Sequence, residues 1–202
     1  MKRFKNILVV ASDDARFALL LDRAVDLARR NDGRLTLIGV VDSERAQRRV
    51  ATDEGATFDV GDLLIDANRE ELEEAASRLA TSDPSADSHV PVEVVVGRGR
   101  DFVEVIRRVV EAGHDLVMVG SAPESRFSSL AGSSLAMHLL RKCPVPVWVD
   151  AANASATPDV AVAVGPFDEG IAEGALDVAL LEIATSLAAR RGGTLHVIHA
   201  WR

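Results

Sequence analysis

Small residues follow an apolar run in the second half of the chain, in a pattern that could hold a phosphate group. Gly120 comes directly after the run DLVMV, and Gly132, Ser133 and Ser134 come just before the run LAMHLLRK. Backbone N–H groups at the start of a helix bind anions, and glycine lets a ligand approach the backbone closely. The segment Val119–Ser134 is therefore the first candidate site, and a nucleotide phosphate fits its chemistry.

Strand and helix patterns alternate around this segment. Five apolar, β-branched runs predict strands, at Phe4–Ala11, Arg34–Val41, Val90–Val96, Asp115–Val119 and Val145–Val149. Amphipathic stretches between them predict helices, so we expect an α/β fold with a doubly wound parallel sheet in the order 3-2-1-4-5. Ligands of such sheets bind beyond the carboxyl ends of the strands, where the winding reverses. That place lies between the first and fourth strands, where Ser12, Asp13 and the loop after Val119 would face one crevice.

Local signals predict where several helices begin and end. Gly33 is expected to end the first helix, and Asp101 to cap the helix after the third strand. Amphipathic spacing predicts a helix over Asp62–Ala80 with solvated charges, and a helix over Ser133–Lys142. The polar segment Asp42–Gly61 is compatible with a loop, a helix or a cover over the sheet.

Composition excludes several classes of protein. The chain is 48% hydrophobic with a formal net charge of -8, and an acidic balance argues against a nucleic-acid partner. No apolar run is long enough to span a bilayer, and the basic start leads into a short strand rather than a signal peptide. The single Cys143 excludes an internal disulfide and fits a reducing compartment. We expect a cytoplasmic protein with no nucleic-acid and no membrane partner.

Neither a catalytic constellation nor a metal site is visible in the sequence. No serine has a histidine and an aspartate arranged around it, and the 5 histidines lack the spacing of metal ligands. The stretch Gly97–Arg100 (GRGR) resembles a phosphate patch, but a turn with solvated arginines after a strand far from the crevice explains it more simply. We therefore predict no catalytic residue and no metal.

The pattern begins again after a linker of small residues. Ala24–Val41 aligns with Ala184–Trp201, and the two stretches share alanines, a Leu-Ala pair, an arginine, a glycine, a leucine and an isoleucine. We predict a complete domain over residues 1–150, a linker over 151–158, and the first βαβ of a second copy over 159–202. Because a lone βαβ unit does not complete a core, we expect it to dock elsewhere or to belong to a longer protein.

Four features of the chain resemble the universal stress protein family. They are the opening KNILVVASDDA, the repeated AxxLAxxxxGxLxxIxVV, the strand and loop HDLVMVGS, and the ending SSLAMHLLRKCPVPVWV. The segment HLLRKCPVPVW further resembles the tandem, two-domain E-type members. The resemblance covers the first domain from end to end and the beginning of a second. It implies a Rossmann-like five-stranded sheet, and dimers or tandem pseudo-dimers joined along the fifth strand.

Members of this family that bind ATP resemble a pattern of Gly, two residues, Gly, nine residues, Gly, then Ser or Thr. Gly120 and the pair Gly132-Ser133 fit its two ends. Pro123 stands in place of the middle glycine and has no N–H to offer a phosphate, and only eight residues, Glu124–Ala131, follow it before Gly132.

The resemblance also bears on the adenine side of the crevice. The family's aspartate at the end of the first strand is replaced by Ser12, with Asp13 one residue later. The candidate nucleotide-binding residues are Ser12, Asp13, Val41, Val119, Gly120, Ser121, Gly132, Ser133 and Ser134.

The fifth strand suggests an interface. It is expected at a sheet edge, where strands pair with partners, and Trp148 stands out in a chain with only 4% aromatic residues. The interface candidates are Val145, Val147, Trp148 and Val149.

These features give two hypotheses for function. The first is a non-catalytic stress-response or regulatory module that acts through a homodimer, a tandem pseudo-dimer or another partner. The alternative is a sensor that binds ATP or another adenine nucleotide in the crevice between strands 1 and 4. A small nucleotide-handling enzyme is a third hypothesis, but no residue set supplies a base and a nucleophile together.

Overall fold

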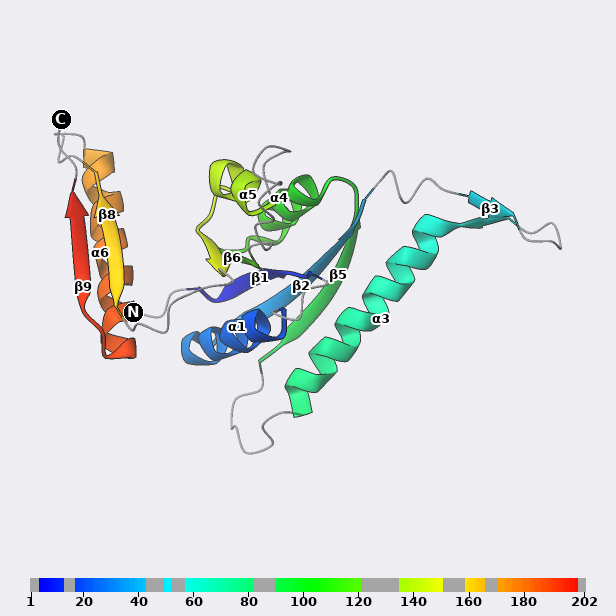
Figure 1. Cartoon of the computed structure of the whole chain (residues 1–202), viewed down its shortest axis with the longest axis horizontal. Coiled ribbons are helices and arrows are strands. Elements are labelled where there is room, and N and C mark those ends of the chain that lie inside the picture. Colours follow the sequence, from blue (N-terminus) through cyan, green and yellow to red (C-terminus); the bar gives the residue numbers. More distant parts are fainter. Residues whose placement is uncertain are drawn as a thin grey trace, which may run out of the picture. The chain divides into compact units, whose positions relative to one another are not determined.

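The computed structural model describes residues 4–12, 17–42, 49–51, 57–81, 90–120, 135–150, 159–165 and 171–199 (Figure 1). The chain forms two compact units, Met1–Ala152 and Asn153–Arg202. Each unit is considered by itself below.

Strands and helices alternate in the first unit. In chain order its elements are β1 (Asn6–Val10), α1 (Phe17–Asn31), β2 (Arg34–Val41), β3 (Arg49–Ala51), β4 (Thr57–Asp59), α3 (Val60–Thr81), β5 (Val92–Arg98), α4 (Asp101–Ala112), β6 (Leu116–Gly120), α5 (Leu135–Lys142) and β7 (Val147–Asp150).

A five-stranded parallel sheet forms the centre of this unit. Its order is β5-β2-β1-β6-β7, which confirms the predicted order 3-2-1-4-5. β1 is the central strand, and it pairs with β2 from Asn6↔Arg34 and with β6 from Ile7↔Leu116. The winding therefore reverses between β1 and β6, where the sequence placed the crevice.

Two apolar layers cover the two faces of the sheet. Alternate residues of β1 point to opposite faces: Ile7 and Val9 pack with α1 and α3, whereas Leu8 and Val10 pack with α4 and α5. Figure 1 shows the same division, with α4 and α5 on one side of the sheet and α1 and α3 on the other. Because both faces are covered, every residue of β1 is buried, which explains its continuous apolar sequence.

The polar segment after β2 contains a hairpin that the sequence did not specify. β3 and β4 form a two-stranded antiparallel pair, with Val50 opposite Phe58. The helix α3 begins at Val60, two residues before the predicted start. Gly61 donates its N–H to the Asp59 carboxylate at 2.9 Å, which supplies an acceptor at the first turn.

Several predicted boundaries shift by a residue or two. Arg100, not Asp101, is the N-cap of α4, and Asp101 is its first helical residue. α1 ends at Asn31 as expected, but Asp32 is the residue with positive φ (52°), and Gly33 is required for another reason. A Cβ on Gly33 would lie 3.0 Å from the Lys5 carbonyl oxygen, so any side chain there would have to push back the backbone just before β1.

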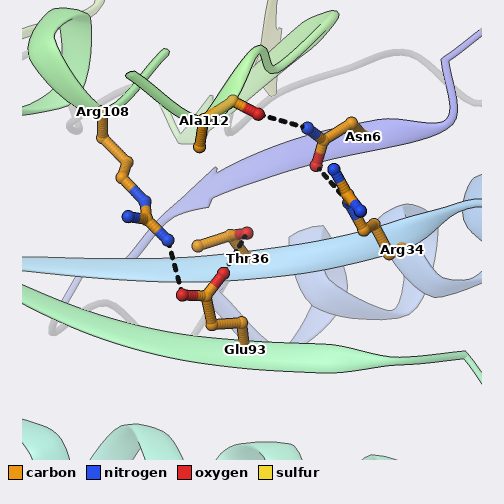
Figure 2. A network of polar contacts seen from close by, with 6 residues as sticks. All are labelled: Asn6, Arg34, Thr36, Glu93, Arg108 and Ala112. Carbon is orange, nitrogen blue, oxygen red and sulfur yellow. Dashed lines mark hydrogen bonds and ion pairs between the residues drawn. The ribbon is translucent and has the colours of Figure 1, made fainter. Parts of the chain in front are cut away.

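Polar contacts join the start of β1 to the end of α4 (Figure 2). The Asn6 side-chain amide donates to the carbonyl oxygens of Ala112 (2.9 Å) and Gly113 (3.1 Å), and its Oδ1 accepts from Arg34 Nε at 3.0 Å. The Asp115 carboxylate accepts the backbone N–H groups of Lys5 (2.7 Å) and Asn6 (3.0 Å). The carbonyl groups at the C-terminus of a helix need hydrogen-bond donors, and here one buried side-chain amide donates to two of them.

The second unit contains one βαβ motif with its own small core. β8 (Val160–Val164) and β9 (Leu195–His199) pair in parallel, and α6 (Ile171–Arg191) connects them. Val162, Val164 and Ala184 form its buried cluster.

The sequence repeat is also a repeat of hydrogen bonds. At the end of α1, Gly33 N–H bonds to Ala28 O at 2.9 Å, and at the end of α6, Gly193 N–H bonds to Ala188 O at 3.0 Å. Ala28 and Ala188 are both buried. The same small residues therefore close the same helix end in both units.

Within the described ranges, no helix combines the length and the apolar composition that a bilayer crossing requires.

Truncation of a central core side chain should destabilise the protein strongly. Leu37 in β2 is 0% exposed, and Leu37→Ala should lower the free energy of unfolding by about 2–5 kcal/mol through lost burial and a cavity. Leu19→Ala is the control, since Leu19 in α1 is 55% exposed and the change should cost less than about 0.5 kcal/mol. Urea unfolding measures both, and equal losses would contradict the assignment of the core.

Removal of the Asn6 side chain should weaken the contact between β1 and α4. Asn6→Ala leaves two helix carbonyls and Arg34 Nε without this partner, so the free energy of unfolding should fall by about 1–3 kcal/mol. Asn68→Ala removes one bond, to Leu64 O within α3, and should cost less. Chemical unfolding of the two variants tests this, and an equal or larger loss for Asn68→Ala would refute it.

Candidate functional site

The predicted crevice lies where the carboxyl ends of β1 and β6 meet. Ser12 follows β1, and Gly120 is the last residue of β6, so the parallel pairing of the two strands brings both to one edge of the sheet. A Cβ on Gly120 would meet none of the described atoms within 4 Å. Among the described residues, nothing crowds Gly120 where the sequence predicts a phosphate.

Two other predicted residues belong to the core. Val41 and Val119 are each 4% exposed. The Val41 carbonyl oxygen accepts the N–H of Gly99 at 3.0 Å, which extends the pairing of β2 with β5. The role of these two valines in nucleotide binding stays a prediction.

The remaining predicted nucleotide-binding residues lie outside the described residues. They are Asp13, Ser121, Gly132, Ser133 and Ser134, and their role in phosphate binding stays a prediction.

A cavity of about 520 Å³ opens at the carboxyl ends of β2 and β5, between the start of α4 and the start of α5. Its walls come from the end of β2, from the turn before α4 with the first turn of that helix, and from one face of α5. The lining residues are Val40, Asp42, Gly99, Arg100, Asp101, Phe102, Leu135, His138 and Lys142.

An aromatic pair and a cation form one wall of this cavity. The rings of Phe102 and His138 stack with centroids 4.5 Å apart and an interplanar angle of 15°. Lys142 Nζ lies 4.7 Å from the centroid of Phe102, a cation–π distance. His138 and Lys142 are one helical turn apart on α5, so a single face of that helix carries both.

The charged side chains that line the cavity differ in the hydrogen bonds and ion pairs that they make. Asp101 accepts the N–H of Phe102 at 2.7 Å, at the start of α4, where the helix dipole also favours a negative charge. Arg100 makes no side-chain ion pair within the described residues, and it leaves its guanidinium exposed at the mouth. Arg100 and Lys142 together therefore suit an anionic group.

A buried carboxylate shapes the wall beside Arg100. Glu104 is 8% exposed and pairs with Arg107. Gly99 has φ of 155°, and a Cβ there would lie 2.8 Å from Glu104 Oε1. Glycine is favoured at this turn mainly by its φ, which other residues rarely adopt, and a side chain there would also displace the end of Glu104.

No sequence pattern singled out Arg100, Phe102, His138 or Lys142 as site residues. The predicted turn with solvated arginines at Gly97–Arg100 is wrong for Arg98, which ends β5 and whose guanidinium lies 3.8 Å from Asp59 and 3.7 Å from Asp62. One sequence feature could have indicated part of this site. His138 and Lys142 are four residues apart in a predicted helix, which puts an aromatic ring and a cation on one helical face.

The predicted interface residues lie at and just before the edge strand β7. Trp148 packs towards the α1 side of the sheet, and Val145, Val147 and Val149 pack towards the α4 and α5 side. Val147, Trp148 and Val149 are only half-buried. At the end of the strand, Asp150 forms an ion pair with Arg23 of α1.

The environment of Cys143 disfavours its reactive form. Burial raises the pKa of the Cys143 thiol above its ordinary value, while the backbone of Val145 acts in the opposite direction, so the nucleophilic thiolate is disfavoured. Among the described residues, no three His, Cys, Asp or Glu side chains gather to hold a metal ion.

Solved structures share this fold. A universal stress protein from Archaeoglobus fulgidus is 18% identical with a TM-score of 0.68, and the match covers 96% of this chain and 65% of that protein. A universal stress protein in complex with cAMP is 17% identical with a TM-score of 0.50, and the match covers 73% of this chain and 96% of the other. At these identities the likeness shows the fold alone.

Sequence relatives give the family. Universal stress protein E of Escherichia coli K12 is 30% identical over 152 residues, which is 74% of this chain and 46% of the relative. The Universal stress protein E homolog of Haemophilus influenzae is 25% identical over 206 residues, which is 98% of this chain and 65% of that protein. The chain thus spans about half to two thirds of the length of the curated relatives it matches.

The first unit carries the family signature along its whole length. The family profile described as "Universal stress protein family" matches residues 3–150, which contain the whole five-stranded sheet and its covering helices. The sheet order, the repeat and the ending at β7 agree with that match, and the chain belongs to the universal stress protein family.

Proposed function

We propose that this chain is a non-catalytic regulatory module that acts by association through the free edge of β7. The observation that carries this proposal is an apolar edge strand whose side chains are half-exposed on both faces. Apolar edge strands invite pairing with another chain, and proteins that stay monomeric usually place charges along such an edge.

The backbone of β7 supports pairing. Val117 N–H bonds to Pro146 O at 3.0 Å, which points the backbone of Pro146 towards β6. Backbone groups alternate in direction along a strand, so the N–H and C=O groups of Val147 and Val149 point towards the open edge. A strand from a partner would satisfy these groups.

The side chains of β7 support the same partner. An added strand would cover Trp148 on one face of the sheet and Val147 and Val149 on the other, which removes apolar surface from water. Arg23 balances the negative charge of Asp150, so the end of the strand does not repel a like strand. The partner is a second copy of this chain or a matching domain in a longer tandem protein.

Blocking the open edge of β7 should abolish association. Val149→Pro removes one N–H from the open edge and leaves the β6 ladder intact, since that N–H does not point towards β6. The dissociation constant of the dimer should rise at least about tenfold, which is 1.4 kcal/mol. Light scattering after size exclusion, over a concentration series, measures this change.

The opposite edge of the sheet offers a matched control. Leu35 N–H bonds to Pro91 O at 2.9 Å, so alternation points the N–H of Val94 in β5 towards the other open edge. Val94→Pro should leave association unchanged. A wild-type chain that stays monomeric at high concentration, or equal effects of the two prolines, would exclude a dimer formed through β7.

A specific observation favours a second function, the binding of an adenine nucleotide. The cavity between α4 and α5 lies at the carboxyl edge of the sheet, where doubly wound folds hold ligands. Its volume of about 520 Å³ is within the usual range for a small-molecule site. A structural relative of the same family was solved in complex with cAMP.

The chemistry of the cavity fits a planar base that carries a phosphate. Phe102 and His138 provide aromatic surface beside the cavity, and Arg100 and Lys142 provide two cations for an anionic group. Arginine matches phosphate oxygens with two parallel hydrogen bonds. The loop after Gly120 would add backbone N–H groups, as predicted from the sequence.

Nucleotide binding should raise the melting temperature through these cations. Wild-type protein with Mg-ATP at 100 times the dissociation constant should gain about 2.7 kcal/mol of stability, with AMP and GTP as comparison ligands. Arg100→Gln and Lys142→Gln should each weaken binding about tenfold or more. Arg69→Gln, on exposed α3, should bind as the wild type does. No ATP-dependent shift in the wild type would refute the sensor function, and equal losses in all three variants would refute this cavity as its site.

A further inference from the structure

A buried histidine stands at the amino end of the sheet, at the opposite end from the cavity. His114 is 4% exposed and lies in the turn between α4 and β6. Among the described residues, neither of its ring nitrogens makes a well-formed hydrogen bond. Buried polar groups in native proteins nearly always have partners, so an imidazole in this state needs an explanation.

The surroundings of His114 are rich in positive charge. Arg34 comes from β2 and Arg108 from α4, and Glu93 of β5 is the acid among these neighbours. Figure 2 shows Arg108 and Glu93 as an ion pair, at 2.5 Å between Nη2 and Oε1, with Thr36 beside them. A proton on His114 would therefore add a third positive charge to a junction that holds two carboxylates, Glu93 and Asp115.

The polar groups from the remaining elements are already engaged in other hydrogen bonds. From β1, Asn6 faces the histidine with its amide already bonded to Ala112, Gly113 and Arg34. Asp115, the next residue, uses its carboxylate for the backbone N–H groups of Lys5 and Asn6. A protonated His114 would have to reach water to be solvated.

His114 also takes part in the hydrogen bonds that close the helix. The backbone N–H of His114 bonds to Val109 O at 3.1 Å. Gly113, with φ of 63°, forms the left-handed cap of α4. The following residue, Asp115, donates its N–H to Asn6 O at 3.0 Å. These are backbone bonds, so they break only if the imidazole carries the backbone of residues 113–115 with it to solvent, and such a local opening would release the end of α4 from the start of β1.

We propose that this junction, formed by Asn6, Arg34, Glu93, Arg108, His114 and Asp115, is an acid-responsive latch. It is closed while His114 is neutral and opens locally when His114 takes up a proton. The latch lies at the amino end of the sheet, whereas the cavity between α4 and α5 lies at the carboxyl end.

The sign of the pH dependence follows from the setting of the imidazole. Burial is the largest cause that lowers the pKa of His114 below its ordinary value of 6.5; Arg108 and Arg34 lower it further, whereas the backbone of Asn6 and the carboxylate of Glu93 raise it. The contribution of His114 to the free energy of unfolding is therefore complete above pH 6.5. It is lost as the pH falls from there towards the lowered pKa. Below the lowered pKa no further loss comes from this group.

The first experiment follows stability against pH in the whole chain. Urea midpoints are measured from pH 7.5 to pH 5 for the wild type, His114→Gln and the control His196→Gln, which replaces an exposed histidine of β9. The wild type and His196→Gln should lose stability below about pH 6.5, with the unfolding equilibrium constant rising up to about tenfold per pH unit, whereas His114→Gln should lose less. Equal pH slopes in all three proteins would overturn the proposal.

A second experiment separates the latch from a purely structural role. Hydrogen exchange of the His114 and Asp115 amides should speed up at pH 5.5 relative to pH 7.5, after correction for intrinsic rates, while the Val103 and Glu104 amides at the other end of α4 should not. Uniform change along α4, or no change, would contradict a local latch.

A direct titration covers the case in which His114→Gln does not fold. The imidazole resonances of His114 in the wild-type protein, followed by NMR against pH, report its pKa. A value below 6.5 is expected, and a value at or above 6.5 would overturn the proposal.

Discussion

The hydrogen bonds between the start of β1 and the end of α4 position the rest of the first unit. Asp115 holds the backbone of Lys5 and Asn6, and the Asn6 amide holds the last carbonyl groups of α4. These contacts bring residue 115 beside residue 6, and the parallel register Ile7↔Leu116 continues from there. The carboxyl ends of β1 and β6 then meet at the other end of the sheet, so the position of the crevice depends on a junction at the opposite edge.

The two ends of the sheet have different physical characters. At the carboxyl end, strand ends and helix starts leave an open cavity with exposed cations, and such a place can accept an anionic ligand. At the amino end, polar side chains from three strands and α4 mostly satisfy one another, beside a second cavity of about 490 Å³. The charged side chains there are partly or fully exposed, whereas His114 is buried, so an added proton on that histidine is the sensitive element of this end.

The two edges of the sheet differ as well. β5 carries Glu93, which pairs with Arg108, and Arg98, which lies near Asp59 and Asp62, so charged side chains accompany that edge. β7 carries apolar side chains up to Asp150, whose charge Arg23 balances. Charged edges resist pairing and apolar edges favour it. For this reason we propose association through β7 rather than through β5.

The sequence by itself determined the fold class, the strand order, the family and the repeat. Periodicity and turn residues are local signals, and a continuous apolar strand such as β1 already implies cover on both faces. The sequence also predicted a crevice at the carboxyl ends of β1 and β6. It predicted that the segment ending in β7 lies at an edge of the sheet. Only the tertiary structure decided which side chains share a cavity, because Arg100, Phe102, His138 and Lys142 come from two helices that meet in space. It alone showed that Gly99 adopts a φ of 155° beside Glu104, and that the buried His114 lies near charged side chains of three elements, Arg34, Glu93 and Arg108. The reason is physical: burial, charge and close approach depend on residues far apart in the chain, and local patterns do not specify which of them come together.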